Sequence, residues 1–324
     1  MSQISLIIPL YNAVKHIRAC LDSVVSQTFD DYEVILVDDG STDETVNIIE
    51  EYTSKNKKFK LISQINNGVS SARNYGIETS TSPYVALLDQ DDVLHPQALE
   101  VLYYLIKKYD TDVSSFDVKV VQDEFNLDKA KLYDIEKLSP VVIDQPVENF
   151  FENHKGKSIW VWNKLYKREA IKGVEFPVGV QPAEDTVFSL KITFNVKSIV
   201  RVNVPFLYYR LSTTSVMKKG VNENYVRSHA KAAWEMYNYF IQSGKVTGQR
   251  LEWVRAYLTR FIFKSLVSQP LRLSHNNEIV KLSQMLTSEL YEKGALQPKL
   301  LGIQKDIACR AFIKKKFFWA KLFI

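Results

Sequence analysis

Residues 84–92, Tyr-Val-Ala-Leu-Leu-Asp-Gln-Asp-Asp, join an apolar run directly to a group of acids. A short apolar run of this kind is typical of a strand buried on both faces of a parallel sheet. Such sheets bind ligands at the carboxyl ends of their strands. Asp89 and Asp91 lie two positions apart, so an extended chain can turn both carboxylates to one face. Paired carboxylates attract a hard divalent cation, Mg²⁺ or Mn²⁺.

The same strand, turn and helix order recurs upstream of this stretch. Apolar runs predict three further strands, at residues 4–10, 34–37 and 59–62. Apolar residues at three- and four-residue spacing predict helices over residues 17–25, 46–52 and 69–77. The alternation predicts an α/β fold, with a mostly parallel sheet covered by helices on both faces.

Polar turns follow three of these strands, at residues 9–12, 38–41 and 89–92. We expect them to meet at one edge of the sheet. Taken singly, the turns at 38–41 and 89–92 are more typical of ordinary turns than of a site, because Asp, Gly and Ser are common turn residues. Ser41 to Glu44 also has the spacing of a capping box for the next helix.

The composition indicates a folded enzyme, with 46% hydrophobic and 24% charged residues over 324 positions. Two distant cysteines, Cys20 and Cys309, indicate neither a disulfide framework nor a zinc site, and favour a reducing cytoplasm. The five histidines are too dispersed to form a ligand set. The first apolar run ends at Pro9 without a basic segment before it, so we expect a strand and no signal peptide. No stretch is long enough for a membrane-spanning helix.

Charge divides the chain into an acidic front and a basic rear. Residues 1–100 carry 7 Lys and Arg against 15 Asp and Glu, a net of −8, and residues 220–324 carry 17 against 7, a net of +10. An acidic front excludes nucleic acid as a partner and suits phosphate held by a metal. A basic, aromatic rear suits an anionic surface.

A purely helical pattern begins near residue 220. Residues 1–219 are therefore expected to form a first domain, which the acidic turn divides into residues 1–92 and 93–219. Residues 220–324 are expected to form a C-terminal helical region.

Five motifs of the first hundred residues resemble family 2 glycosyltransferases with the GT-A fold, of the bacterial polysaccharide-biosynthesis type. In order they are Ile-Ile-Pro-Leu-Tyr-Asn (7–12), Leu-Asp-Ser-Val-Val-Ser-Gln-Thr (21–28), Val-Asp-Asp-Gly-Ser-Thr-Asp (37–43), Asn-Gly-Val-Ser-Ser-Ala-Arg-Asn (67–74) and Leu-Asp-Gln-Asp-Asp (88–92). The resemblance implies an inverting, metal-dependent transfer from a UDP-sugar to a hydroxyl of a glycan or lipid-linked acceptor, in capsule or exopolysaccharide synthesis.

The resemblance implies that residues 1–219 are the catalytic domain, with a nucleotide-binding half at 1–92 and an acceptor half at 93–219. It also implies site residues. Those expected to bind the nucleotide-sugar are Pro9 and Tyr11 beside the base, Asp38 or Asp39 on the uracil edge, Asn67 and Arg73 near base or phosphate, Asp89 at the ribose, and Gln90. Asp91 is expected to hold Mn²⁺ or Mg²⁺, with Asp89 as a possible second ligand and Asp92 as a supporting neighbour.

Two later segments, Trp162 to Tyr166 and Ala183 to Phe188, resemble further motifs of this family. The second ordinarily supplies the base that deprotonates the acceptor hydroxyl, which assigns this role to Asp185, with Glu184 as the alternative. Acids at the start of a helix are also stabilised by its dipole, so a structural role for both stays open.

Three further residues or segments have expected roles, and two of them have two alternatives each. Trp162 is either an acceptor contact or a core residue. Arg210 resembles a family position that contacts the diphosphate after a loop closes. The tail at 311–324 combines lysines with large apolar residues, which indicates either peripheral contact with an anionic membrane or a helix docked on the protein body. Pairing through the aromatic-rich helices would give a homodimer.

Two other classes of protein were weighed. A sugar-nucleotide nucleotidyltransferase usually needs a Gly-rich loop near its start, whereas the first glycine here is Gly40. A catalytically silent scaffold with the same fold would not need to retain Asp89, Asp91 and Asp185.

Overall fold

The computed structural model describes the chain except for residues 1, 122–129, 153–159, 211–219 and 275. The chain divides into two compact units. The first comprises Met1–Val178 and Phe188–Thr213, and the second comprises Gly179–Val187 and Thr214–Ile324.

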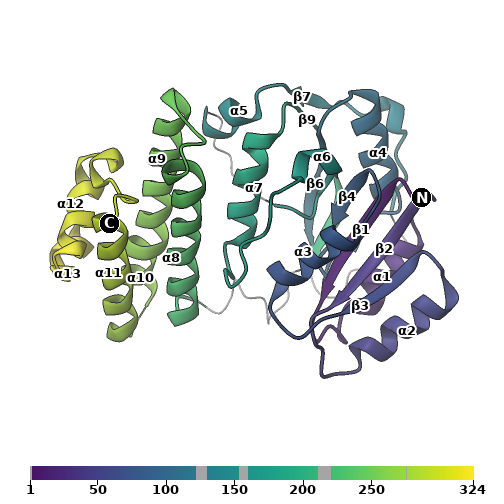
Figure 1. Cartoon of the computed structure of the whole chain (residues 1–324), viewed down its shortest axis with the longest axis horizontal. Helices are drawn as coiled ribbons and strands as arrows, with labels where there is room; N and C mark the ends of the chain where they lie inside the picture. Colours follow the sequence, from purple (N-terminus) through teal and green to yellow (C-terminus); the bar gives the residue numbers. More distant parts are fainter. Residues whose placement is uncertain (1, 122–129, 153–159, 211–219, 275) are drawn as a thin grey trace. The chain divides into compact units, whose positions relative to one another are not determined.

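A single sheet organises the first unit (Figure 1). Its strands are β1 (Ile4–Leu10), β2 (Tyr32–Asp38), β3 (Phe59–Ser63), β4 (Tyr84–Leu87), β5 (Val93–Leu94), β6 (Val113–Val121), β7 (Val141–Ile143), β8 (Lys164–Lys167) and β9 (Ile199–Arg210). In space they follow the order β3-β2-β1-β4-β8-β6-β9-β5, and β7 pairs with β9.

The first four strands pair in parallel, with Leu10 opposite Asp38 and Ile7 opposite Leu87. Strand β8 runs antiparallel to both β4 and β6, whereas β6 and β9 are parallel. The predicted mostly parallel sheet with helices on both faces is confirmed, and the antiparallel strand in its middle is an addition to the prediction.

Helices connect the strands of this unit. They are α1 (Ile17–Val25), α2 (Thr45–Lys55), α3 (Val69–Thr79), α4 (Ala98–Lys108), α5 (Pro146–Glu152) and α6 (Arg168–Ile171), with a short 3-10 turn η2 (Ile135–Lys137). The expected capping box is wrong, because α2 begins after Glu44 without a side-chain cap. The Ser41 hydroxyl instead accepts a hydrogen bond from the backbone N–H of Asn12, at 3.0 Å.

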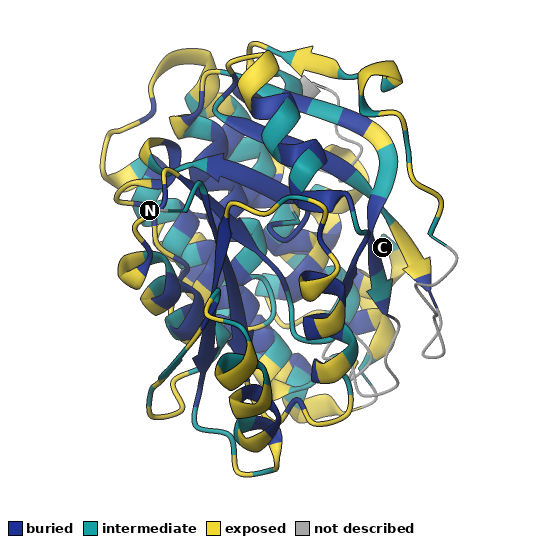
Figure 2. Ribbon diagram, turned by 90° about the vertical axis from the view of Figure 1, so that its right-hand side faces the viewer, coloured by how far each residue is buried: buried dark blue, intermediate teal, exposed yellow. Residues whose placement is uncertain are grey.

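The sheet is the core of the first unit, and Figure 2 shows its central strands buried while the outer faces of the helices are exposed. Gly76 lets α3 lie directly on β1 and β2. A Cβ at this position would lie 2.4 Å from Ile7 Cγ2 and 3.1 Å from Val37 Cγ2. The absence of a side chain therefore sets how closely the helix approaches the sheet.

The second unit is helical (Figure 1). Its elements are α8 (Glu223–Tyr237), η4 (Asn238–Gln242), α9 (Gly248–Ile262), η5 (Phe263–Ser268), α10 (Gln269–Leu273), α11 (Asn277–Glu292), η6 (Pro298–Leu301), α12 (Ile303–Ile313) and α13 (Phe317–Leu322). Helix α7 (Glu184–Asn195) begins in this unit and continues into the first. Within the described ranges, no helix combines the length and apolar character needed to cross a membrane.

Candidate functional site

Three neighbouring strands end in polar residues at one edge of the sheet. β1 lies between β2 and β4, and all three run in the same direction. Their carboxyl ends lead into Tyr11, into Asp38 and Asp39, and into the acidic turn at 89–92. The topology thus brings the three predicted polar turns together.

Asp39 orders the loop that precedes α3. Its Oδ1 accepts hydrogen bonds from the Asn67 backbone N–H at 2.8 Å and from Gln64 Nε2 at 2.6 Å, and its Oδ2 accepts from the Gly68 N–H at 2.8 Å. Asp39 is buried, whereas the Asn67 side chain is exposed at the edge of the site. Asp38, also buried, accepts from the Ser41 N–H at 3.2 Å. Asp39 therefore links the end of β2 to the start of α3.

Arg73 forms an ion pair with Asp89. The distance from Arg73 Nη2 to Asp89 Oδ1 is 2.7 Å, and the side chains are 2% and 26% exposed. The guanidinium also lies 5.1 Å from the centre of the Phe176 ring. Arg73, predicted near base or phosphate, thus lies in the interior beneath the acidic turn, and it fixes Asp89 at the rim.

Burial and mutual repulsion raise the pKa values of the next two acids. Burial, together with the negative charge of Asp89, raises the pKa of Asp91 to about 6. Asp92 is fully buried, and this burial, with the charge of Asp91, raises its pKa well above the usual range. Arg210 contacts this turn, since its backbone N–H donates to Asp92 Oδ1 at 3.2 Å and its Nε donates to the Asp91 carbonyl at 3.1 Å. The turn concentrates negative charge that a cation would neutralise.

Gln90 and Tyr11 form a reciprocal pair. The Tyr11 N–H donates to Gln90 Oε1 at 2.8 Å, and Gln90 Nε2 donates to the Tyr11 carbonyl at 3.2 Å. The Tyr11 side chain is 45% exposed, while Pro9 is buried within β1. The pair joins the end of β1 to the acidic turn and leaves the Tyr11 ring accessible.

Several residues of this site could not be predicted from the sequence, because they act through their position in the fold. Asn12 has a φ of +47°, and its Oδ1 accepts from the Thr42 N–H at 2.9 Å. Gln64 donates a hydrogen bond to Asp39, and the Phe176 ring lies against the Arg73 guanidinium. Asn12 falls inside a quoted motif, whereas no pattern in the sequence marks Gln64 or Phe176.

Trp162 is largely buried in a stack of aromatic rings. Its ring centre lies 5.2 Å from that of Trp160 and 5.5 Å from that of Tyr209, with interplanar angles of 14° and 4°. Trp160, at the end of the stack, is only half-buried. Tyr209, at the other end, is half-buried too, so the two outer rings of the stack are more accessible than that of Trp162.

Glu184 and Asp185 occupy the first turn of α7 and belong to the second unit. Glu184 is buried, and Asp185 is partly exposed. The residue before them, Ala183, has a φ of +97°, a backbone conformation that residues with a side chain rarely adopt. Both acids start a helix, so the favourable dipole expected for them is present.

The donor set of the acidic turn fits a cation that takes most of its ligands from elsewhere. Within the described ranges, no three His, Cys, Asp or Glu side chains are grouped to hold a metal ion. Mg²⁺ and Mn²⁺ bound with a nucleotide commonly use one or two carboxylates and fill the remaining positions with phosphate oxygens and water. Asp91, with Asp89 two positions away, satisfies that requirement.

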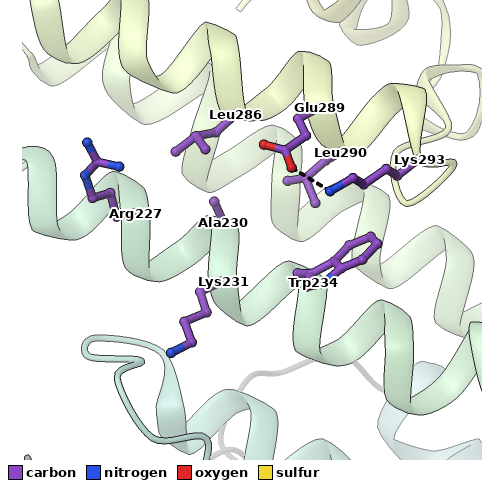
Figure 3. A pocket seen from close by; sticks show the side chains of 8 residues that line it. All are labelled: Arg227, Ala230, Lys231, Trp234, Leu286, Glu289, Leu290 and Lys293. Atoms are coloured by element: carbon purple, nitrogen blue, oxygen red, sulfur yellow. Dashed lines mark hydrogen bonds and ion pairs between the residues drawn. The ribbon is translucent and has the colours of Figure 1, made fainter.

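The second unit has a groove of about 270 Å³ between α8 and α11 (Figure 3). Its cations already have protein partners. Lys293 Nζ lies 2.6 Å from Glu289 Oε1 and 4.6 Å from the centre of the Trp234 ring, and Arg227 Nε lies 2.7 Å from Glu223 Oε1. The groove therefore lacks the concentrated charge of the acidic turn.

A mostly parallel sheet with polar turns at the carboxyl ends of its strands defines a class of α/β proteins that bind their ligands at that edge. The model of glycosyl transferase family 2 matches residues 5–174, and the chain belongs to this family. The relatives include EpsH of Bacillus subtilis, named as a glycosyltransferase, which is 32% identical over 222 residues covering 67% of this chain and 63% of its own. Another, the poly(ribitol-phosphate) beta-glucosyltransferase of Bacillus spizizenii, is 29% identical over 64% of this chain and 32% of its own.

The fold is shared with TarS of S. aureus. The crystal structure of TarS residues 1–349 in complex with UDP-GlcNAc aligns with a TM-score of 0.75 at 19% identity, covering 100% of this chain and 90% of that one. The similarity confirms the GT-A fold. In sequence, the match covers less than two thirds of EpsH, at 63%, and 32% of the glycosyltransferase GlyA of Streptococcus pneumoniae.

Proposed function

We propose that this glycosyltransferase transfers a sugar from a UDP-sugar to an acceptor hydroxyl with inversion at the anomeric carbon. The observation that carries the proposal is the meeting, at one sheet edge, of the exposed Tyr11 ring, the Arg73–Asp89 pair and the acidic turn. TarS, which shares the fold, binds UDP-GlcNAc and UDP. These features support a nucleotide-sugar donor at the same edge here.

Each residue of the edge has a proposed part in holding the donor. The Tyr11 ring stacks on the base, and Asp38 or Asp39 accepts from the uracil N–H, with Asn67 beside it. Asp89, held by Arg73, accepts from the ribose hydroxyls. Arg210 lies against the acidic turn, where it suits the negative charge of the diphosphate.

Asp91 is proposed to hold Mn²⁺ or Mg²⁺, with Asp89 as a second ligand and Asp92 supporting the turn. A cation bound there would neutralise charge on the departing diphosphate. It would also offset the two causes that raise the pKa of Asp91, which are its burial and the negative charge of Asp89.

Asp185 is proposed as the general base, with Glu184 as the alternative. Its carboxylate takes the proton of the acceptor hydroxyl while the hydroxyl oxygen forms a bond to the anomeric carbon. The bond between that carbon and the diphosphate oxygen breaks on the opposite side, so one displacement inverts the configuration. The nucleoside diphosphate leaves with the electron pair.

The acceptor is proposed to be a glycan or a lipid-linked sugar of a surface polysaccharide. Support comes from relatives whose names refer to polymer synthesis, among them the poly(ribitol-phosphate) beta-glucosyltransferase. The aromatic stack at Trp162 offers a half-buried ring, Trp160, against which a sugar could pack.

A donor screen tests this function. Release of UDP from a panel of UDP-sugars is measured with Mn²⁺, with Mg²⁺ and with a chelator, for the wild type, Asp91→Ala and Asp185→Asn. We expect metal-dependent turnover that both substitutions reduce by at least about a hundredfold. Proton NMR of the first glycoside formed reports its anomeric configuration. Turnover that is independent of the metal and unchanged by Asp91→Ala would overturn the proposal.

The rival scaffold function predicts a different outcome. A catalytically silent protein would bind UDP without releasing it from any sugar, with or without acceptor. Binding measured by calorimetry together with zero turnover across the panel would favour the scaffold.

We further propose that the C-terminal tail attaches the protein to the inner face of the cell membrane. Helix α13 packs through the buried Ala320, and the Phe317 ring lies 5.6 Å from that of Phe312. It nevertheless exposes three large apolar side chains, with exposed fractions of 75% for Phe318, 55% for Trp319 and 63% for Leu322. Lysines 314–316 and 321 flank them, a composition suited to an anionic interface.

Flotation with liposomes tests this attachment. The wild type is expected to float with vesicles that contain an anionic lipid and to remain in the bottom fraction with purely zwitterionic vesicles. The double substitution Phe318→Ser with Trp319→Ser should lose flotation. Val120→Ser, which removes an apolar side chain 55% exposed in the first unit, is the matched control. Equal flotation of the double variant and the control would exclude the tail as the attachment site.

A further inference from the structure

The turn that leads into α7 lies against α8 of the helical unit. Residues 179–187 and α8 belong to the same compact unit. The turn contains Gly179 with a φ of +73° and Ala183 with a φ of +97°, and α7 begins immediately afterwards with Glu184 and Asp185. The backbone of the turn therefore sets where the two acids begin.

Three side chains of α8 contact this turn. Asn224 Nδ2 donates to the Gln181 carbonyl at 2.9 Å, and Ser228 Oγ donates to the Pro182 carbonyl at 2.7 Å. Lys231 Nζ lies 2.8 Å from the position that a Cβ on Gly179 would occupy. Positions 224, 228 and 231 are spaced four and three residues apart, so they share one face of the helix.

Of these three side chains, Lys231 is drawn in the close view of α8. Figure 3 shows it at the border of the groove, pointing away from the α11 side chains and toward a neighbouring loop. Ser228 is buried, whereas Asn224 is exposed. The two hydrogen bonds hold successive carbonyls directly before Ala183, whose positive φ needs support from its surroundings.

We propose that Asn224 and Ser228 are positioning residues for Asp185. By fixing the carbonyls of Gln181 and Pro182, they hold the strained turn that sets the first residues of α7. The helical unit thereby takes part in the reaction, although neither side chain touches substrate. This inference rests on the proposed function, in which Asp185 is the base.

The test compares kinetic constants of substituted enzymes. Ser228→Ala, Asn224→Ala and their double variant are expected to lower kcat by about tenfold to a hundredfold, because a small displacement of a catalytic group is costly. The KM for the donor and the affinity for UDP should stay unchanged. Ser228→Thr retains a hydroxyl and should restore most of kcat, which a purely structural role would not require.

Ser283→Ala is the matched control. The buried Ser283 hydroxyl also donates to a carbonyl in the same unit, that of Leu266, at 2.5 Å. The control should keep wild-type kcat even if its thermal midpoint falls. Asn224 is exposed, so Asn224→Ala gives a folded variant even if Ser228→Ala does not.

Asp185→Asn separates the two possible failures. Wild-type turnover of Asp185→Asn would overturn the assignment of the base, and this inference with it. Loss of turnover in Asp185→Asn, together with Ser228→Ala and Asn224→Ala variants that match Ser283→Ala, would overturn the positioning role alone.

Discussion

Arg73 and Asp89 are joined by a 2.7 Å ion pair in which the arginine is almost wholly buried and the carboxylate reaches the surface. The pair joins α3 to Asp89, the second residue after β4, so it ties a helix to the sheet edge at which the donor is proposed to bind. Because the pair is buried, the loss of one partner costs more unfolding free energy than it does in a surface ion pair of the same length.

Arg73→Leu should destabilise the protein and weaken donor binding. Removing one partner leaves Asp89 without its cation, which costs about 2 kcal/mol of unfolding free energy. The measurement is chemical denaturation together with calorimetry of UDP binding. Arg18→Leu is the control, because its pair with Glu51 is also 2.7 Å long but is 52% and 48% exposed. The control should lose clearly less unfolding free energy, because solvent screens a pair in which both side chains are exposed. Equal losses would show that burial of the Arg73 pair adds nothing.

Mn²⁺ and UDP together should raise the thermal midpoint of the wild type. At free concentrations a hundred times the dissociation constant, binding adds about 2.7 kcal/mol, which corresponds to a shift of about 5 to 10 °C. Asp91→Asn should lose most of the increment due to the metal and keep that due to UDP alone. Differential scanning fluorimetry measures both. A full metal increment in the variant would remove Asp91 from the proposed ligand set.

Gly76→Ala should disturb the contact of α3 with the sheet. The new methyl group would lie 2.4 Å from Ile7 Cγ2, so the helix must shift at a cost of about 2 kcal/mol. Because α3 also carries Arg73, UDP affinity should fall with stability. Glu78→Ala, at an exposed position of the same helix, is the control and should change neither. A stable Gly76→Ala variant with normal UDP affinity would contradict the expectation.

Acid should weaken the helical unit through His229. Burial lowers the pKa of His229 from its ordinary value of 6.5, and the nearby charge of Lys264 acts in the same direction. The unfolded chain then binds a proton before the folded one, so the unfolding free energy is constant above about pH 7.5 and falls as the pH drops below 6.5. Denaturation between pH 5 and 8 should show a shallower decline for His229→Gln. His95, whose pKa burial also lowers, has the same sign in the first unit, so His95→Gln is the parallel test.

The first half of the fold could be predicted because each of its elements carries its own pattern. The expected strand at residues 4–10 coincides with β1, and the expected helix at 69–77 falls within α3 (Val69–Thr79). Strand β8 (Lys164–Lys167) escaped prediction, since four residues with lysine at both ends show no strand pattern. Its place in the sheet comes from partners about fifty and eighty residues away in sequence.

The candidate site likewise has a part that could be predicted from the sequence and a part that could not. The three polar turns could be expected at one edge, because parallel strands end on the same side. The burial of Arg73 could not be predicted, since it depends on Asp89, sixteen residues later, and on the Phe176 ring. Likewise, no periodicity places residues 179–187 with the helical unit, because that grouping arises from tertiary contacts.

Gln90 has a consequence for how the sheet ends. One N–H of its primary amide and its carbonyl oxygen lie in the same plane, as the two polar groups of a peptide do, and they bind both backbone groups of Tyr11. A side chain thus acts as one more rung of the β ladder, beyond the last residue of β1. Glutamate has the same shape but would supply only the acceptor. The residue between the two acids of Asp-Gln-Asp must therefore both donate and accept a hydrogen bond, as a backbone peptide group does.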